Sequence, residues 1–504
     1  MLRGCHSKYV NLFASVSSIH LEPCEMVLSM VSATMRVFKP ASASTDAGVG
    51  TASASGAIDN SEAPVDYRKY LVIGTAYALP DEDEPTRGRI LVLSCNGSSE
   101  THGGHDAPGG DVSSSPRAAR IVTELQVRGG VYSMCQFYEG KLLVTVNSKT
   151  QVCQMVNDGT GVVKLSMVGV GHHGHILSLF VKSQAGKPMG AAPSVASMKQ
   201  PGKQQGSESE REMLAVVGDL MRSISVVQYY PQHETLEEVA RDFNANWTTA
   251  VEMLTNDVYL GGESYNNLFV LRRNTKAQSE EVRCRLDTVG EFHLGEMVNK
   301  FMSGSLVMPQ STSSASNKAA GGRSLRRSLA SPKKTSGPSD SGKPSASQGT
   351  AASMRSQRPV VVTGSQTLFG TVEGTLGVVL GLDGPTTAFF ASLERAMDRT
   401  IKPVGDFSHQ QFRAFSAEQR IHPRHGFVDG DLVESFLDLD RSTMERVVQQ
   451  MNRDGGWETD DTAWMASGGG PDKGADSADS ADDFRSDLTV EDVLAVVEEM
   501  AMLH

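Results

Sequence analysis

The sequence predicts a mainly β chain: a β-propeller of the WD40-like kind, followed by a small C-terminal α-helical domain. Short segments rich in Val, Ile, Leu and Tyr recur along the chain, and several end in a glycine turn and resume, as in VIGTA, VVGDL, YLGGE and LFGTV. After Pro385 the apolar spacing becomes that of a helix. Hairpins that recur along the chain are typical of propeller blades, with a β-sandwich as the alternative.

The predicted strands follow from runs of β-branched, leucine and tyrosine side chains that end at glycine or polar turns. In chain order they cover residues 70–77, 89–95, 131–137, 141–147, 176–182, 213–219, 223–230, 258–260, 268–272 and 377–382. Their repetition indicates successive antiparallel units rather than one central sheet.

Four stretches rich in Gly, Ser, Ala and Pro interrupt these strands at residues 40–64, 96–118, 183–211 and 309–359. Such compositions bury too little apolar area to offset chain entropy, so we expect disordered inserts. The last insert is basic, with nine Lys and Arg residues against Asp340 alone. Within it Arg323–Ser328 resembles a basophilic kinase site; a passive charged linker is the alternative.

The helical part begins near Asp383. Apolar side chains at positions 389, 390, 393, 397 and 401 share one helix face, and Ser442 with Glu445 and Thr489 with Asp492 have the spacing of capping boxes. An acidic loop is expected over residues 454–487, where ten acids face two bases. The predicted organisation is an unassigned segment 1–20, a propeller region 21–383, which the resemblance described below implies to be incomplete, and a helical domain 384–504.

Composition excludes several classes of protein. The 504 residues carry 47 Lys and Arg against 59 Asp and Glu, a net charge of −12, which argues against a cationic coat for nucleic acid over the whole surface. Six cysteines without a CxxC pair argue against a disulfide framework or structural zinc. No apolar run approaches the roughly 20 residues of a membrane helix.

The sequence predicts no catalytic, cofactor or metal residues and therefore no enzyme. It contains no nucleophile-elbow, zinc-protease, Walker-type or dinucleotide glycine motif. Gly171–His175 (GHHGH) is the best metal candidate, but no further ligand lies near it in sequence, so a polar loop before a strand is favoured. His293 and Glu296 would share a helix face; a partly buried polar group on a strand or bend is favoured.

Arg222, Arg241 and Trp247 have the composition of a protein-binding hot spot. The alternative, favoured by composition, is that Trp247 packs in the core and the arginines pair with acids.

Several longer strings, in order, resemble the C-terminal part of the large subunits of UV-damaged DNA-binding complexes. The same module is shared with the large subunits of cleavage/polyadenylation and U2-associated splicing complexes. The strings lie at Tyr70–Leu93, Gly129–Phe137, Gly218–Tyr230, Arg241–Leu254 (RDFNANWTTAVEML), Gly290–Phe301, Gly304–Met308, Leu368–Val379 and Gly426–Leu439 (GFVDGDLVESFLDL).

The resemblance implies most of the third of three seven-bladed propellers, followed by the helical domain. It implies a non-enzymatic adaptor module of a cullin-4 RING ubiquitin ligase, linked to the DNA damage response and protein ubiquitination, in the nucleus and also the cytoplasm. The alternative is a nucleic-acid-binding scaffold subunit of an mRNA 3′-end processing or splicing complex. Cullin-4 would be a partner only if the missing propellers were supplied, and any DNA or RNA association would be indirect.

In the family, one surface of the third propeller binds substrate receptors. The matching positions of this sequence therefore predict a protein interface, and no cofactor is expected. It comprises Leu179 and Phe180 in HILSLFVK, Arg222 in GDLMRS, and Arg241 and Trp247 in RDFNANW. Phe180 stands where the family often has Tyr, so a hydroxyl contact is not expected there.

Overall fold

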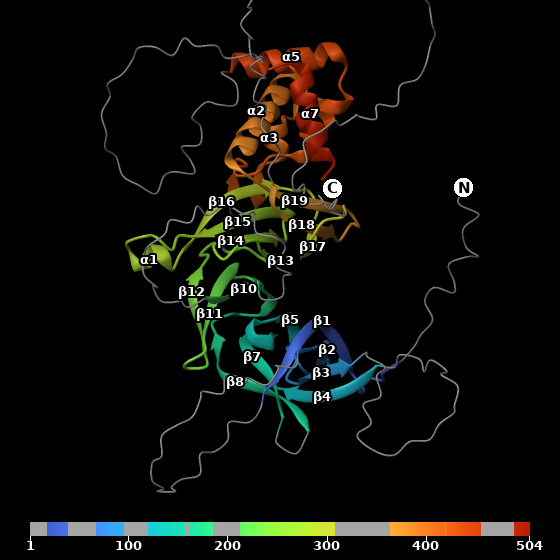
Figure 1. Ribbon diagram of the computed structural model, residues 1–504, viewed down its shortest axis with the longest axis vertical. Helices are drawn as coiled ribbons and strands as arrows, with labels where there is room; N and C mark the ends of the chain where they lie inside the picture. Colours follow the sequence, from blue (N-terminus) through green and yellow to red (C-terminus); the bar gives the residue numbers. More distant parts are fainter. Residues whose placement is uncertain are drawn as a thin grey trace, which may run out of the picture.

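The structure, a computed structural model, describes residues 18–38, 67–94, 119–157, 162–184, 212–307, 363–418, 420–454 and 488–503. In this part of the chain five antiparallel sheets, the first three joined by short parallel pairings, follow one another and lead into a group of helices (Figure 1). The predicted inserts, the kinase-like motif and the acidic loop lie almost wholly outside the described residues. None of the described helices is long and apolar enough to cross a membrane.

Each sheet is built from strands that are consecutive in sequence. The first is β1 (Glu25–Phe38), β2 (Tyr67–Tyr77), β3 (Gly88–Ser94) and β4 (Arg120–Val127); the second is β5 (Val131–Gln136), β6 (Leu142–Val146), β7 (Lys149–Asn157) and β8 (Val163–His173). The third is β9 (Ser178–Ser183), β10 (Met213–Asp219), β11 (Ile224–Tyr230) and β12 (Thr235–Arg241). The fourth is β13 (Thr248–Met253), β14 (Val258–Glu263), β15 (Asn267–Arg273) and β16 (Leu286–His293); the fifth is β17 (Val298–Ser303), β18 (Thr363–Thr371) and β19 (Leu376–Leu382).

The five sheets are arranged as the blades of a propeller. Their first strands are neighbours in the order β1, β5, β9, β13 and β17. Figure 1 shows the sheets following one another from β1–β4 to β17–β19, with the helices beyond the last sheet. The prediction of a mainly β, partial propeller followed by helices is therefore confirmed, with five of the seven blades that the resemblance implies for a whole propeller.

A separate apolar core fills each space between neighbouring sheets. Successive residues of a strand point to opposite faces, so Leu214 and Val216 enter the core shared with the fourth sheet, whereas Ala215 and Val217 enter the core shared with the second. Because both faces of a middle strand are buried, these strands read as continuous apolar runs rather than as alternating ones. Burial on both faces therefore explains the apolar runs from which the strands were predicted.

Gly169 shows how closely the second and third sheets approach each other. Its φ is +54°, and a Cβ there would collide with the carbonyl oxygen of Glu234 in the β11–β12 turn. The amide of Val170 donates to that same carbonyl, at 3.0 Å. Only glycine combines this backbone conformation with so close an approach.

The helical domain packs its own core beyond the fifth sheet. It comprises α2 (Gly384–Thr400), η3 (Val404–Asp406), α3 (His409–Phe412), β20 (Phe415–Ala417), β21 (Arg420–His422), α4 (Gly430–Glu434), η4 (Ser435–Asp438), α5 (Arg441–Arg453) and α7 (Val490–Ala501). Two short helices, η1 (Tyr138–Gly140) and α1 (Glu280–Arg283), lie within the sheet region.

Three caps fix where these helices begin. Asp383 accepts from the amide of Thr386 at the start of α2, and Thr489 forms the predicted capping box with Asp492. The capping box predicted at Ser442 is wrong: Asp440 caps α5 by accepting from the amide of Thr443. Asp440, also a favoured N-cap residue, lies two positions before Ser442 and starts the helix earlier than the spacing rule predicted.

Arg413, in the segment after α3, joins the helical domain to the fourth sheet. Its Nη1 donates to the carbonyls of His293 and Leu294, its Nε lies 2.5 Å from Asp429 Oδ2, and its guanidinium stacks 4.8 Å from the ring of Phe292. Both charged side chains are buried. Asp429 thus holds the Arg413 guanidinium within the helical domain, and that guanidinium attaches the domain to the fourth sheet.

Candidate protein interface

The predicted interface residues come from four separate segments of the third and fourth sheets. Leu179 and Phe180 lie on β9, and Arg222 lies in the turn between β10 and β11. Arg241 is the last residue of β12, and Trp247 immediately precedes β13.

A buried hydrogen-bond network centred on Ser223 draws three of these segments together. Ser223 Oγ donates to Asp242 Oδ2 at 2.6 Å, and Asn246 Nδ2 lies 3.2 Å from Ser223 Oγ and 3.3 Å from Asp242 Oδ2. The amide of Ser223 also donates to the carbonyl of Asn246. These three residues adjoin Arg222, Arg241 and Trp247 in sequence, so the network brings together the three segments that carry those side chains.

The carboxylate of Asp219 ties the same turn to the start of β9. Its Oδ1 accepts from the amides of Met221 and Arg222, and its Oδ2 accepts from the amides of Ile176 and Leu177. Four backbone donors on one buried carboxylate form a rigid turn.

Arg222 and Arg241 converge on one backbone oxygen. Nη1 of Arg222 lies 3.0 Å, and Nη2 of Arg241 3.2 Å, from the carbonyl of Gly174. Nη2 of Arg241 also lies 2.7 Å from Glu238 Oε2. In an undistorted strand residues three apart face opposite sides; here a bulge at Val239 adds one residue and brings both side chains to the same side.

Two aromatic side chains on the segments joined by the Ser223 network are exposed to solvent. Trp247 is 46% exposed and Phe243 is 70% exposed. The expectation that Trp247 packs in the core is therefore wrong: its polar neighbours Asn246 and Thr248 are buried instead and hold the loop. We call Met221, Arg222, Arg241, Phe243 and Trp247 the Arg–Trp surface.

Sequence reasoning missed Phe243, although it stands within the RDFNANW string. The usable signal was the alternation in that string, where the buried polar residues Asp242 and Asn246 flank the exposed aromatic one. Among the described residues, Leu179 and Phe180 do not take part in the Ser223 network. Phe180 is partly buried and packs against the core between the third and fourth sheets.

His293 and Glu296 serve the structure, as the favoured interpretation had it. His293 ends strand β16 and its Nδ1 lies 2.8 Å from Asn267 Oδ1, while burial lowers its pKa. Glu296 accepts from the hydroxyl of Thr371 at 2.7 Å. The two side chains have separate partners.

The GHHGH segment is not the polar loop that was expected. Strand β8 continues to His173, and the turn after it places His175 against the third sheet. Glu238 of β12 completes a cluster with His172 and His175, which sequence distance had hidden.

Burial of His175 makes the stability of the fold depend on pH. Burial, with a contribution from His172, lowers the pKa of His175 to about 4, against 6.5 for the free side chain. The unfolded chain therefore binds a proton at a pH where the folded chain does not, and stability is lost as the pH falls from about 6.5 to 4. At about 1.4 kcal/mol per pKa unit the loss reaches about 3 kcal/mol.

Urea unfolding between pH 7 and pH 4 measures this loss. A His175→Gln variant, which does not titrate in this range, is expected to show a shallower fall in stability than the unsubstituted chain. Parallel curves for the two proteins would contradict the assignment.

Comparison with known proteins adds two findings. Residues 8–438 match the family described as the CPSF A subunit region. The chain is 34% identical over 389 residues to DNA damage-binding protein 1b of Arabidopsis thaliana, 34% over 387 residues to DNA damage-binding protein 1 of Solanum lycopersicum, and 33% over 386 residues to the protein of that name in Oryza sativa subsp. japonica. Each match covers 77% of this chain and 27% of the relative, so the chain spans about a quarter of the length of these relatives.

Proposed function

The chain belongs to the family of the CPSF A subunit region, and from this we propose that it is a non-enzymatic scaffold whose Arg–Trp surface binds a partner protein. The observation that carries the proposal is the juxtaposition of exposed Trp247 and Phe243 with Arg222 and Arg241 on a buried polar network. Tryptophan and arginine dominate protein-binding hot spots, and a rigid surface loses little entropy when it binds.

We also propose which kind of partner this surface binds. The relatives are named for DNA damage binding, and the family resemblance implies an adaptor of a cullin-4 RING ubiquitin ligase. In that role the Arg–Trp surface receives a helical segment of a substrate receptor in the nucleus, and also in the cytoplasm. Since the chain spans 27% of its relatives, cullin-4 would join only with the remaining propellers supplied.

The family's description also names a cleavage/polyadenylation subunit, which supports a second candidate, a scaffold for mRNA processing. Direct contact with RNA requires Lys and Arg side chains on phosphates, and such binding weakens steeply with salt. A helical peptide held mainly by aromatic side chains shows a far weaker salt dependence. Titration of the chain with each ligand at two salt concentrations therefore separates the candidates.

Replacing Trp247 by alanine is expected to weaken the binding of helical receptor peptides at least tenfold and to leave the fold intact. The side chain is half-exposed, so its loss removes contact area from the partner rather than from the core. Fluorescence anisotropy with labelled peptides from cullin-4 substrate receptors measures the affinity. Tyr67→Ala, an aromatic 49% exposed on the first sheet, is the matched control. Equal affinity for the Trp247 variant, with an unchanged melting temperature, would reject the proposal.

A further inference from the structure

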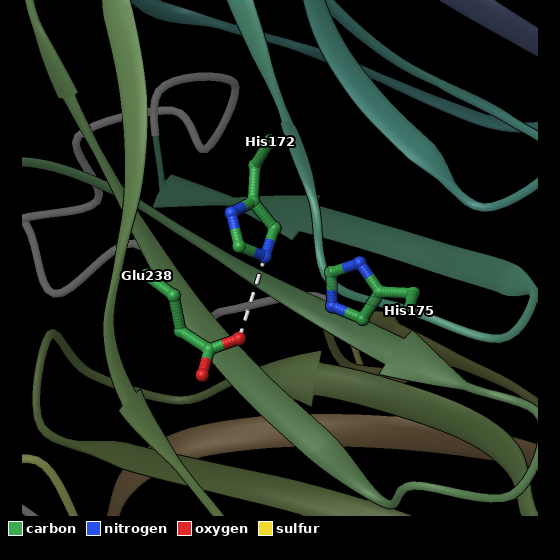
Figure 2. Close-up of side chains that lie close together, drawn as sticks. All are labelled: His172, His175 and Glu238. Atoms are coloured by element: carbon green, nitrogen blue, oxygen red, sulfur yellow. Dashed lines mark ion pairs between the residues drawn. The ribbon is translucent and has the colours of Figure 1, made fainter.

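Three potential metal ligands converge where the second and third sheets meet (Figure 2). His172 is the penultimate residue of β8, His175 lies in the turn before β9, and Glu238 lies on β12. One donor atom from each lies within 4.8 Å of the others, and His172 Nε2 is 3.4 Å from Glu238 Oε2. Around a tetrahedral zinc ion with bonds of about 2.0–2.1 Å, ligand atoms lie about 3.3–3.4 Å apart.

The imidazoles have ring nitrogens that the protein leaves without hydrogen bonds. His175 Nδ1 is buried and makes none, and His172 Nε2 is buried with only the 3.4 Å ion-pair contact to Glu238 Oε2, which is long for a hydrogen bond. A buried polar atom without a partner costs about 1–3 kcal/mol, so each one calls for an explanation such as a bound ion. Ser225 Oγ, 2.6 Å from His175 Nε2, holds that ring in place.

The two strands that carry His172 and Glu238 both have irregular pairing near the cluster. β8 departs from regular pairing with β7 between Thr150 and Val152, and β12 carries the bulge at Val239. Gly174, between the two histidines, has no Cβ, and one there would lie 2.5 Å from His172 Nε2. Bulges are frequent beside functional sites, because they redirect side chains.

Arg241 lies beside the cluster, and it donates a hydrogen bond to one of the two oxygens of the Glu238 carboxylate. Its Nη2 donates to Oε2, at 2.7 Å. Among the described residues no hydrogen bond engages the second oxygen, Oε1. A ligating carboxylate is commonly held by such a hydrogen bond from a neighbour.

We propose that His172, His175 and Glu238 bind a divalent transition-metal ion, preferentially Zn²⁺. Two histidines and one glutamate are a donor set that zinc accepts, with the fourth position left to water. The ion links the outer strand of the second sheet to the outer strand of the third, because His172 and Glu238 belong to different blades. The site stands independently of the proposed partner binding.

Calorimetric titration of the full chain with ZnCl₂, after treatment with EDTA, tests the site. One ion is expected to bind per chain and to raise the melting temperature. Glu238→Gln and His172→Asn are each expected to weaken the affinity at least tenfold. His173→Asn removes the neighbouring imidazole, which lies outside the cluster, and is expected to bind as the unsubstituted chain does. Substitution with Co²⁺ is expected to give the intense visible absorption of a tetrahedral site.

Three results would overturn the proposal: no binding of Zn²⁺ by the unsubstituted chain, unchanged affinity in the two ligand variants, or an equal loss in His173→Asn. Circular dichroism establishes that each variant is folded. If either ligand variant fails to fold, the other decides, together with the Co²⁺ spectrum of the unsubstituted chain.

Discussion

Replacing Arg413 by alanine is expected to lower the free energy of unfolding of the helical domain by about 3–5 kcal/mol. The substitution leaves the buried carboxylate of Asp429 without its cation, which is the costly way to break a buried ion pair. It also removes the donors to the carbonyls of His293 and Leu294, so hydrogen bonds between the helical domain and the fourth sheet are lost.

Chemical denaturation followed by the near-ultraviolet signal measures the effect. Arg399→Ala is the control, since Arg399 pairs with Asp454 at 2.6 Å but is 57% exposed. An exposed pair contributes at most about 1 kcal/mol, so this variant should unfold almost as the unsubstituted chain does. Similar losses for the two variants would show that Arg413 does not hold the helical domain on the fourth sheet.

Replacing Asp242 by alanine is expected to cost roughly 3–5 kcal/mol and to abolish partner binding as well. Ser223, Asn244 and Asn246 would all lose an acceptor, and unsatisfied buried donors cost about 1–3 kcal/mol each. Arg222 and Trp247, which this network positions, would then adopt many conformations and bind with a larger entropy penalty.

Asp242→Asn separates the charge from the hydrogen bonds. Burial raises the pKa of Asp242, and its carboxylate oxygens accept from Ser223, Asn244 and Asn246. Asparagine keeps one acceptor, and we expect it to lose less than half as much stability as alanine. Thermal melting and peptide anisotropy on the same preparations measure both effects. An alanine variant that binds peptide normally would show that the network does not organise the surface.

Strands buried on both faces were the most predictable part of the fold. An apolar run that ends at a glycine turn, such as Met213–Asp219, is typical of a buried strand. Strand β10 covers that range. Strand β1 was not predicted, because Ser29, Ser32 and Thr34 interrupt its apolar run. The cap of α5 was placed two residues late, since Asp440 and Ser442 are both good N-cap residues.

The candidate sites depend on tertiary contacts, and this limits what a sequence reveals. The resemblance predicted Arg222, Arg241 and Trp247 as interface residues. It did not predict the buried Ser223, whose hydrogen bonds join their segments. Glu238 lies 63 positions after His175 in the chain and reaches it only because a bulge shifts the alternation of β12. Neither burial of a small polar residue nor a bulge leaves a periodic signal in the sequence.

Because every sheet is made of consecutive segments, most stabilising contacts join a sheet only to the ones before and after it. Such an array behaves as a one-dimensional chain of coupled units, in which damage at one place weakens its neighbours first. The first sheet and the helical domain stand at opposite ends of this chain (Figure 1). A nascent polypeptide could therefore complete its early blades on the ribosome while later ones are still being synthesised.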